Sequence, residues 1–168
     1  TLDVGAQGIV VPHVDTVEDA RSVVEAGRFS PLGKRGNYTS RQGIGIEDYS
    51  AKANDQVLLV VLIEDVVAIE NLDEILSVDG IDVFFVAPGD LAQSMGYLGQ
   101  MQHPEVQSTV DRAYERIIRA GRVAGGMAPD NNVEAIVEKG VKFLMTSWES
   151  WLESGARSYL ERVKSATK

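Results

Sequence analysis

The sequence has 168 residues, which fits one domain but is short for a complete (β/α)8 barrel of about 250 residues. A net charge of −9 without any Lys/Arg-rich run argues against a nucleic-acid partner, and the absence of cysteine excludes disulfides, thiolate metal sites and cysteine nucleophiles. The longest apolar run, residues 57–63, is far too short to cross a bilayer and the N-terminus does not look like a signal peptide, so we expect a cytoplasmic protein.

Five short apolar runs rich in β-branched residues recur along the chain and are predicted to be strands. They cover residues 8–14, 57–63, 83–87, 123–127 and 141–146. None of them alternates cleanly between apolar and polar side chains. Continuous apolar strands are typical of a parallel sheet that is buried on both faces by helices.

A helical pattern follows each predicted strand. The first helix is expected to begin after Thr16, the N-cap of a sequence typical of a capping box, and to end at Gly27. The later helices are predicted at residues 66–76, 104–120, 133–138 and 151–163. Five strand–helix units in one domain, residues 1–168, predict an α/β fold with right-handed crossovers.

The unit order favours a barrel over an open doubly wound sheet. No Gly-x-Gly-x-x-Gly follows the first predicted strand, and no Walker-type motif is present. We therefore predict a (β/α)8 TIM-barrel type fold of which this chain holds about the last five βα units. One long connection, residues 28–46, interrupts the pattern and is predicted to be a functional or mobile loop.

Two carboxylates stand where consecutive predicted strands end. Glu64 follows Val61-Leu62-Ile63, and Asp90 follows Val86-Ala87-Pro88-Gly89. Neighbouring strands lie about 5 Å apart, so both side chains are expected to reach one hard cation such as Mg²⁺ or Mn²⁺. The alternative is that each acid only caps the following helix.

The turn before Asp90 favours the binding interpretation. Pro88 stiffens the backbone, and Gly89 lets an anion approach the N–H groups that open the next helix. A substrate carboxylate held at this turn, with its keto oxygen on the metal, is a coherent arrangement.

The remaining polar candidates are weaker. His13 ends the first predicted strand, which is a plausible position for a general base, whereas His103 precedes Pro104 and is expected in a surface loop. In the long loop, Arg35 and Arg41 are expected either to meet an anionic substrate or to be solvated. Two tryptophans after the last strand are expected to pack at a barrel rim or a subunit contact: Trp148 and Trp151.

Over nearly its whole length the sequence resembles the HpcH/HpaI aldolase family, which contains 4-hydroxy-2-oxoheptanedioate aldolase. The order and spacing of several segments agree together, and any one of them alone would be a weak signal. These segments are Val10-Val11-Pro12-His13-Val14, Glu18-Asp19-Ala20-Arg21, Pro31-Leu32-Gly33-Lys34-Arg35-Gly36, Ile63-Glu64, Ala87-Pro88-Gly89-Asp90-Leu91 with Met95-Gly96, and His103-Pro104-Glu105-Val106.

The resemblance implies a class II, metal-dependent aldolase that releases pyruvate and an aldehyde from a 4-hydroxy-2-oxo acid, as in the catabolism of aromatic compounds. It implies Mg²⁺ or Mn²⁺ (Co²⁺ is possible) held by Glu64 and Asp90, with the pyruvate carboxylate at the turn of Pro88, Gly89 and Asp90. It also implies that Asp3 orients the catalytic histidine, and that the protein is a homo-oligomer, by resemblance a hexamer, whose partners are small 2-oxo acids and aldehydes.

Two departures from the family pattern bear on activity. The family's first three βα units, which hold the histidine base and an arginine that steadies the enolate, have no counterpart here. Leu62 stands where close relatives have glutamine. We therefore expect a part of a longer protein, and we keep two alternatives: an enzyme similar to citryl- or malyl-CoA lyase, and a catalytically silent metal-binding fragment that needs its N-terminal portion.

Overall fold

One five-stranded sheet organises the computed structural model, which describes residues 1–37 and 41–167. All neighbouring strands are parallel, and they lie side by side in the order in which they occur in the sequence. A doubly wound sheet would reverse its strand order partway, so this order confirms the predicted partial TIM barrel. The strands are β1 (Gly8–Val11), β2 (Leu58–Ile63), β3 (Val83–Val86), β4 (Ala124–Met127) and β5 (Phe143–Met145).

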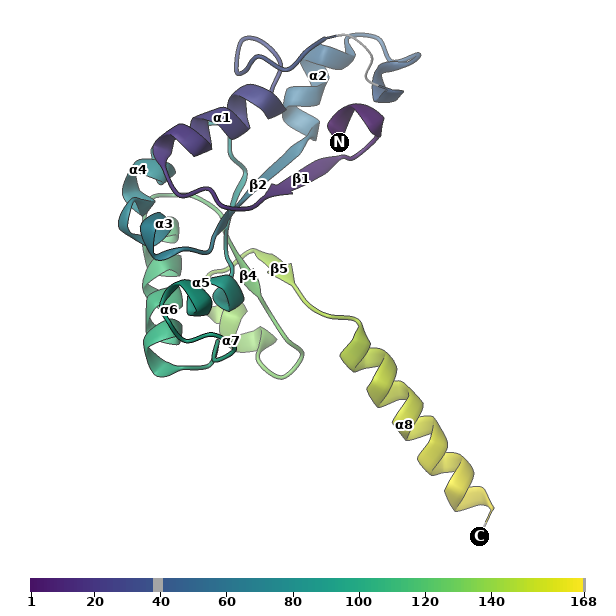
Figure 1. The fold of residues 1–168 in the computed structure, drawn as a ribbon. Coiled ribbons are helices and arrows are strands. Elements are labelled where there is room, and N and C mark those ends of the chain that lie inside the picture. The colour runs from purple at the N-terminus through teal and green to yellow at the C-terminus, as the bar shows by residue number, and fades with distance from the viewer. Residues whose placement is uncertain (38–40, 168) are drawn as a thin grey trace.

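The helices pack against the outer face of this half-barrel, with the exception of the last one (Figure 1). The main hydrophobic core lies between the outward side chains of the strands and helices that include α1, α4 and α6. The helices are α1 (Val17–Gly27), α2 (Tyr49–Gln56), α3 (Val66–Glu70), α4 (Leu72–Leu76), α5 (Pro88–Ser94), α6 (Pro104–Arg119), α7 (Val133–Glu138) and α8 (Glu149–Ala166), with short 3-10 turns η1 (Leu2–Val4) and η2 (Arg41–Gly43).

The two faces of the sheet differ in how well they are covered. Alternate residues of β2 such as Leu59 and Ile63 join the outer core, whereas Val60 belongs to a small inner cluster with Phe85. Burial on both faces, as predicted, holds for β2 and β3. It is wrong for the edge strand β1, where Val10 is 56% exposed, and for the edge strand β5, because each edge strand has a neighbour on one side only.

The predicted helices are correct in place but not all in extent. The capping box at Thr16 is confirmed, since its hydroxyl accepts a hydrogen bond from the N–H of Asp19 at 3.1 Å. The helix expected over residues 66–76 is two short helices that meet at Asn71, whose side-chain amide turns away to donate to the carbonyl of Asp15 at 2.9 Å. Helix α2 was not predicted, because it buries only Ala53 and therefore has no apolar stripe to detect, and α5 is the helix that was expected to open at the turn before Asp90 but was given no bounds.

A buried arginine links the amino ends of β2 and β3. The guanidinium of Arg28 is 3% exposed and donates to the carbonyls of Gly80, Asn54 and Val57 at 2.7 to 3.1 Å. It also forms an ion pair with Asp82 at 2.6 Å. A single side chain thus satisfies three main-chain acceptors from two segments, the junction of α2 with β2 and the turn before β3.

Alkaline pH is expected to destabilise the fold through Tyr114, which α6 buries against Gly126 of β4. Burial, with a smaller contribution from the charge of Asp111, raises the pKa of Tyr114 from 10.0 to about 12. The folded state therefore keeps the phenolic proton where the unfolded state has lost it, and stability falls by roughly 2–3 kcal/mol between pH 10 and 12. Urea unfolding across this range should show the slope, and Tyr114→Phe should remove most of it; equal slopes would contradict the assignment.

Helix α8 extends away from the body of the chain (Figure 1). None of its residues is buried, and its exposed apolar side chains include Trp151, Leu152, Tyr159 and Leu160. Within residues 1–37 and 41–167, no helix is both long enough and apolar enough to cross a membrane.

Candidate metal and substrate site

The structure brings Glu64 and Asp90 to the same cavity. Glu64 directly follows β2, and Asp90 lies in the first turn of α5 after β3; the two strands are paired, with Ile63 opposite Val86. Both acids line a cavity of about 330 Å³ at the carboxyl ends of the strands. The rest of its wall is largely apolar and is formed by Val10, Leu62, Phe85, Ala87, Pro88, Gly89, Met101, Met127, Phe143 and Met145.

Glu64 is a buried carboxylate without an arginine or lysine partner in the part of the chain that the structure describes. It is 3% exposed, and its Oε1 accepts a hydrogen bond from the main-chain N–H of His13 at 2.9 Å. The Nδ1 atom of His13 lies 3.6 Å from the same oxygen, on an imidazole that is 76% exposed. A carboxylate that is buried in this way ordinarily needs a compensating positive charge, and a bound cation would supply it.

Neither acid makes a side-chain capping hydrogen bond in the structure, although Asp90 lies in the first turn of α5, where an acid is favourable. The residue that caps α3 is Asp65, whose carboxylate accepts from the N–H of Val67 at 2.9 Å and from the hydroxyl of Ser94 at 2.8 Å. These hydrogen bonds lower the pKa of Asp65, the bond from Val67 most. Helix α5 has no side-chain cap, so the carboxylate of Asp90 is not used in this way either.

Asp15 is a further acid near this end of the sheet. Burial is the main cause that raises the pKa of Asp15, and the charge of Asp65 is the second. One carboxylate oxygen of Asp15 is buried without a hydrogen-bond partner. The carboxyl of Asp15 therefore takes up a proton more readily than an exposed aspartate does.

The turn of Pro88, Gly89 and Asp90 forms one wall of the cavity. Pro88 is buried in the first turn of α5, and a Cβ at Gly89 would meet no atom within 4 Å. The main chain at Gly89 is therefore open to the cavity, and anion binding at this turn stays a prediction.

The donor set fits a hard divalent cation that keeps several exchangeable ligands. Two carboxylates are too few to enclose an ion, and the described residues contain no group of three His, Cys, Asp or Glu side chains that could do so. Mg²⁺ and Mn²⁺ commonly take one or two carboxylates and complete their shell with water and substrate oxygens. The residues that would hold such an ion are Glu64 and Asp90.

Asp3 lies outside this cavity. It belongs to η1, ahead of β1, and lines a separate hollow with Arg35. The Nη2 of Arg35 donates to Asp3 Oδ1 at 2.7 Å, and its guanidinium lies over the ring of Phe29 at 4.5 Å. Arg35 is thus buried and ion-paired, so the expectation that it is solvated is wrong, while its Nη1 has no hydrogen-bond partner among the described residues.

His103 and Arg41 also lie away from the cavity. The ring of His103 stacks on Tyr97 at 3.8 Å, and its Nδ1 accepts from the N–H of Glu105 at the start of α6, so it caps a helix. Arg41 is exposed in η2. Trp148 and Trp151 are exposed at the base of α8, where the indole N–H of Trp151 donates to Asp130 at 3.3 Å.

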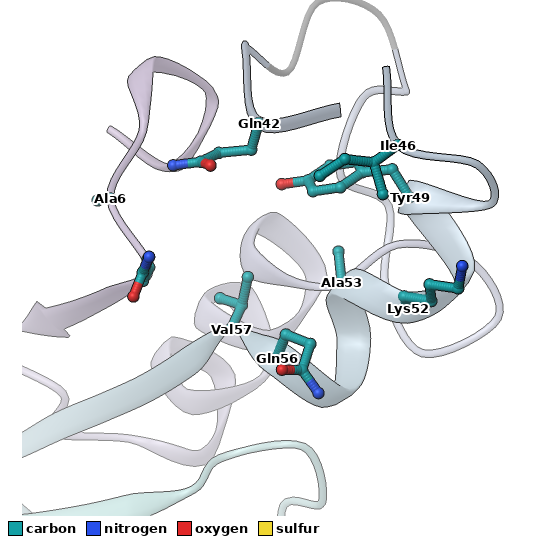
Figure 2. A pocket seen from close by; sticks show the side chains of 9 residues that line it. Ala6, Gln42, Ile46, Tyr49, Lys52, Ala53, Gln56 and Val57 are labelled. Carbon is teal, nitrogen blue, oxygen red and sulfur yellow. The ribbon is translucent and has the colours of Figure 1, made fainter. Parts of the chain in front are cut away.

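A different hollow of about 470 Å³ lies near the opposite ends of β1 and β2, between the segment around Ala6, the side chain of Gln42 and helix α2 (Figure 2). Its polar lining consists of glutamine, tyrosine and lysine side chains and holds no carboxylate among the described residues. Reactive groups of parallel barrels lie at the carboxyl ends of the strands, so the cavity with Glu64 and Asp90 remains the candidate site.

Comparison with known proteins identifies the family. Residues 1–150 match the family model described as HpcH/HpaI aldolase/citrate lyase. The chain is 46% identical over 134 residues to a 2-keto-3-deoxy-L-rhamnonate aldolase of Klebsiella pneumoniae, covering 77% of this chain and 50% of that protein. It is 43% identical over 162 residues to the enzyme of the same name in Escherichia coli O9:H4, covering 92% of this chain and 60% of that protein.

A solved structure supports the same family. A HpcH/HpaI aldolase/citrate lyase family protein from Burkholderia cenocepacia superposes with a TM-score of 0.86 at 31% identity, covering 97% of this chain and 67% of that one. This chain spans 50–60% of the length of the two curated relatives above. Its sequence match, strand order and overall superposition together show that it belongs to the HpcH/HpaI aldolase/citrate lyase family.

Proposed function

We propose that this chain carries the metal-binding part of a class II aldolase, which cleaves a 4-hydroxy-2-oxo acid to pyruvate and an aldehyde. The observation that carries the proposal is the shared cavity of Glu64 and Asp90 beside an open turn at Gly89. Membership of an aldolase and lyase family supports the reaction class. The cofactor is Mg²⁺ or Mn²⁺, and the protein works in the cytoplasm.

Each site residue has a distinct task. Glu64 and Asp90 hold the cation, and the turn of Pro88, Gly89 and Asp90 places the substrate carboxylate. When bound, the metal supplies Lewis-acid stabilisation of the charge that develops on the 2-oxo group. The largely apolar wall, including Leu62 and Phe85, lowers the polarity around the site and so strengthens these electrostatic interactions.

The general base comes from outside the described part of this chain. None of the described residues that line the cavity is histidine, lysine or arginine. A role for Asp3 in orienting that base stays a prediction from the family resemblance, since Asp3 pairs with Arg35 ahead of β1 and lies outside the cavity of this chain. A longer polypeptide or a neighbouring copy supplies the base, and the exposed apolar side chains of α8 support a homo-oligomer.

The names of the relatives narrow the substrate class. The compound in their name, 2-keto-3-deoxy-L-rhamnonate, is itself a 4-hydroxy-2-oxo acid. A sugar-derived acid of this kind is therefore the first substrate to test, ahead of the intermediates of aromatic catabolism.

Proton exchange of pyruvate in D₂O tests the proposal. We expect Mn²⁺ with this chain alone to leave the methyl protons unexchanged by NMR. A form extended at its N-terminus by the first three βα units of the Escherichia coli relative should exchange them and release pyruvate from 2-keto-3-deoxy-L-rhamnonate. The same extended form with Glu64→Gln is the control. Exchange that is independent of Glu64, or no exchange by the extended form, would contradict the proposal.

A further inference from the structure

The residue after Pro12 has an unusual backbone conformation. His13 has φ 54°, and the described residues include one other non-glycine residue with positive φ, Asp48 at 57°. The left-handed region costs an L-residue about 1–2 kcal/mol, although His, Asn and Asp enter it more readily than other side chains. Such a conformation persists only where the surrounding contacts hold it in place.

Two contacts hold His13 in this conformation. The next residue, Val14, is 1% exposed in the hydrophobic core, which anchors the chain where β1 leads into α1. The main-chain N–H of His13 points across to the next strand and donates to Oε1 of Glu64 at 2.9 Å. This bond joins the carboxyl ends of β1 and β2, and it is strengthened by the charge of its acceptor.

The bond also leaves the carboxylate of Glu64 with one committed and one available oxygen. Its Oε1 accepts from His13, whereas Oε2 receives no hydrogen bond from the part of the chain that the structure describes. The carboxylate is 3% exposed, so few alternative orientations are open to it. From this geometry we infer that His13 is a positioning residue, whose main-chain N–H fixes Glu64 so that its second oxygen is presented to the cation.

The imidazole of His13 is not the group that acts. It is 76% exposed, and His13 is not among the residues that line the cavity. The inference rests on the proposed function, since it assigns a role toward the metal held by Glu64. His13, which was considered a candidate general base from the sequence, is thus assigned a different role.

Substitutions at His13 separate main chain from side chain. Glycine lacks the imidazole but adopts positive φ without strain, so His13→Gly keeps the N–H in place. Valine also lacks the imidazole, but its β-branch makes positive φ strongly unfavourable, so His13→Val turns the N–H away from Glu64. Asp48→Val imposes the same backbone penalty at an exposed position outside the cavity and is the matched control.

Calorimetric titration of the chain with Mn²⁺ measures the effect. We expect His13→Val to weaken binding about 10- to 100-fold, the usual consequence of removing a group that orients a metal ligand. His13→Gly and Asp48→Val should bind close to the wild type, with thermal unfolding showing that all three variants are folded. Equal losses in His13→Gly and His13→Val would assign the role to the imidazole and overturn the inference, as would unchanged binding by His13→Val.

A metal-free measurement keeps the inference testable on its own. In the ¹H–¹⁵N NMR spectrum, the His13 amide proton should lie downfield, and it should move upfield in Glu64→Gln because a charged acceptor has become neutral. If the wild-type chain binds no Mn²⁺, the proposed function fails, and the amide signal alone decides whether His13 holds Glu64. An amide proton that does not respond to Glu64→Gln would overturn the inference.

Discussion

Glu64→Gln is expected to weaken Mn²⁺ binding by about 100-fold or more. Changing a group that merely supports a metal ligand costs about 10- to 100-fold in affinity, and Glu64 is proposed as a ligand itself. The neutral amide is a poorer donor for a hard cation, and the largely apolar wall of the cavity magnifies the lost charge. Isothermal titration calorimetry with Mn²⁺ measures the loss, and Asp90→Asn should show a comparable one.

The neighbouring acid provides the control. Asp65 follows Glu64 directly in sequence, but its carboxylate caps α3 and interacts with Ser94. Asp65→Asn removes the same charge from the same strand end and should leave Mn²⁺ affinity close to the wild type. Wild-type affinity in both Glu64→Gln and Asp90→Asn would rule out the proposed metal site.

Arg28→Met is expected to lower the free energy of unfolding by about 3–5 kcal/mol, because it removes a buried guanidinium that forms an ion pair and several hydrogen bonds. The substitution removes the ion pair with Asp82, which keeps the bond from the N–H of Leu59, and leaves the carbonyls of Gly80, Asn54 and Val57 without this donor. Domains are stable by only about 5–15 kcal/mol, so the loss should be visible as a much lower urea midpoint.

Arg116→Met serves as the matched substitution. Its guanidinium is 28% exposed and pairs with Asp73, which is 80% exposed. Ion pairs of this kind contribute about 0–1 kcal/mol, and the additional bond from Arg116 to the carbonyl of Ile69 adds a modest amount. An equal loss in the two variants would show that the central position of Arg28 has no special importance.

Much of the fold was predictable because its signals lie in short stretches of sequence. The strands β2 and β3 are continuous apolar runs, as buried strands are, and the capping box at Thr16 is encoded within four residues. The edge strands and α2 depend on what surrounds them. Nothing in the composition of β1 indicates that Val10 is exposed, and α2 has no apolar stripe.

The candidate site was predictable in its residues but not in its contacts. A carboxylate at a strand end is visible in the sequence, and the order of strands places Glu64 beside Asp90 in one cavity. The hydrogen bond from His13 to Glu64 joins residues 51 positions apart, and it depends on one backbone angle that no sequence pattern specifies. The ion pair of Arg35 with Asp3 was missed for the same reason, since it joins residues 32 positions apart.

Because α8 is exposed, its helicity is expected to depend on the protein concentration. In proteins most helical stability comes from the packing of an amphipathic face, and α8 contacts the rest of the chain near its first turns, where Trp151 donates to Asp130. In the homo-oligomer proposed above, the exposed apolar side chains of α8 would pack against a neighbouring copy, so dilution should fray α8 before it disturbs the sheet. The proposed metal ligands precede α8 in the sequence and lie on the half-barrel, so self-association and cation binding should respond separately as the protein is diluted.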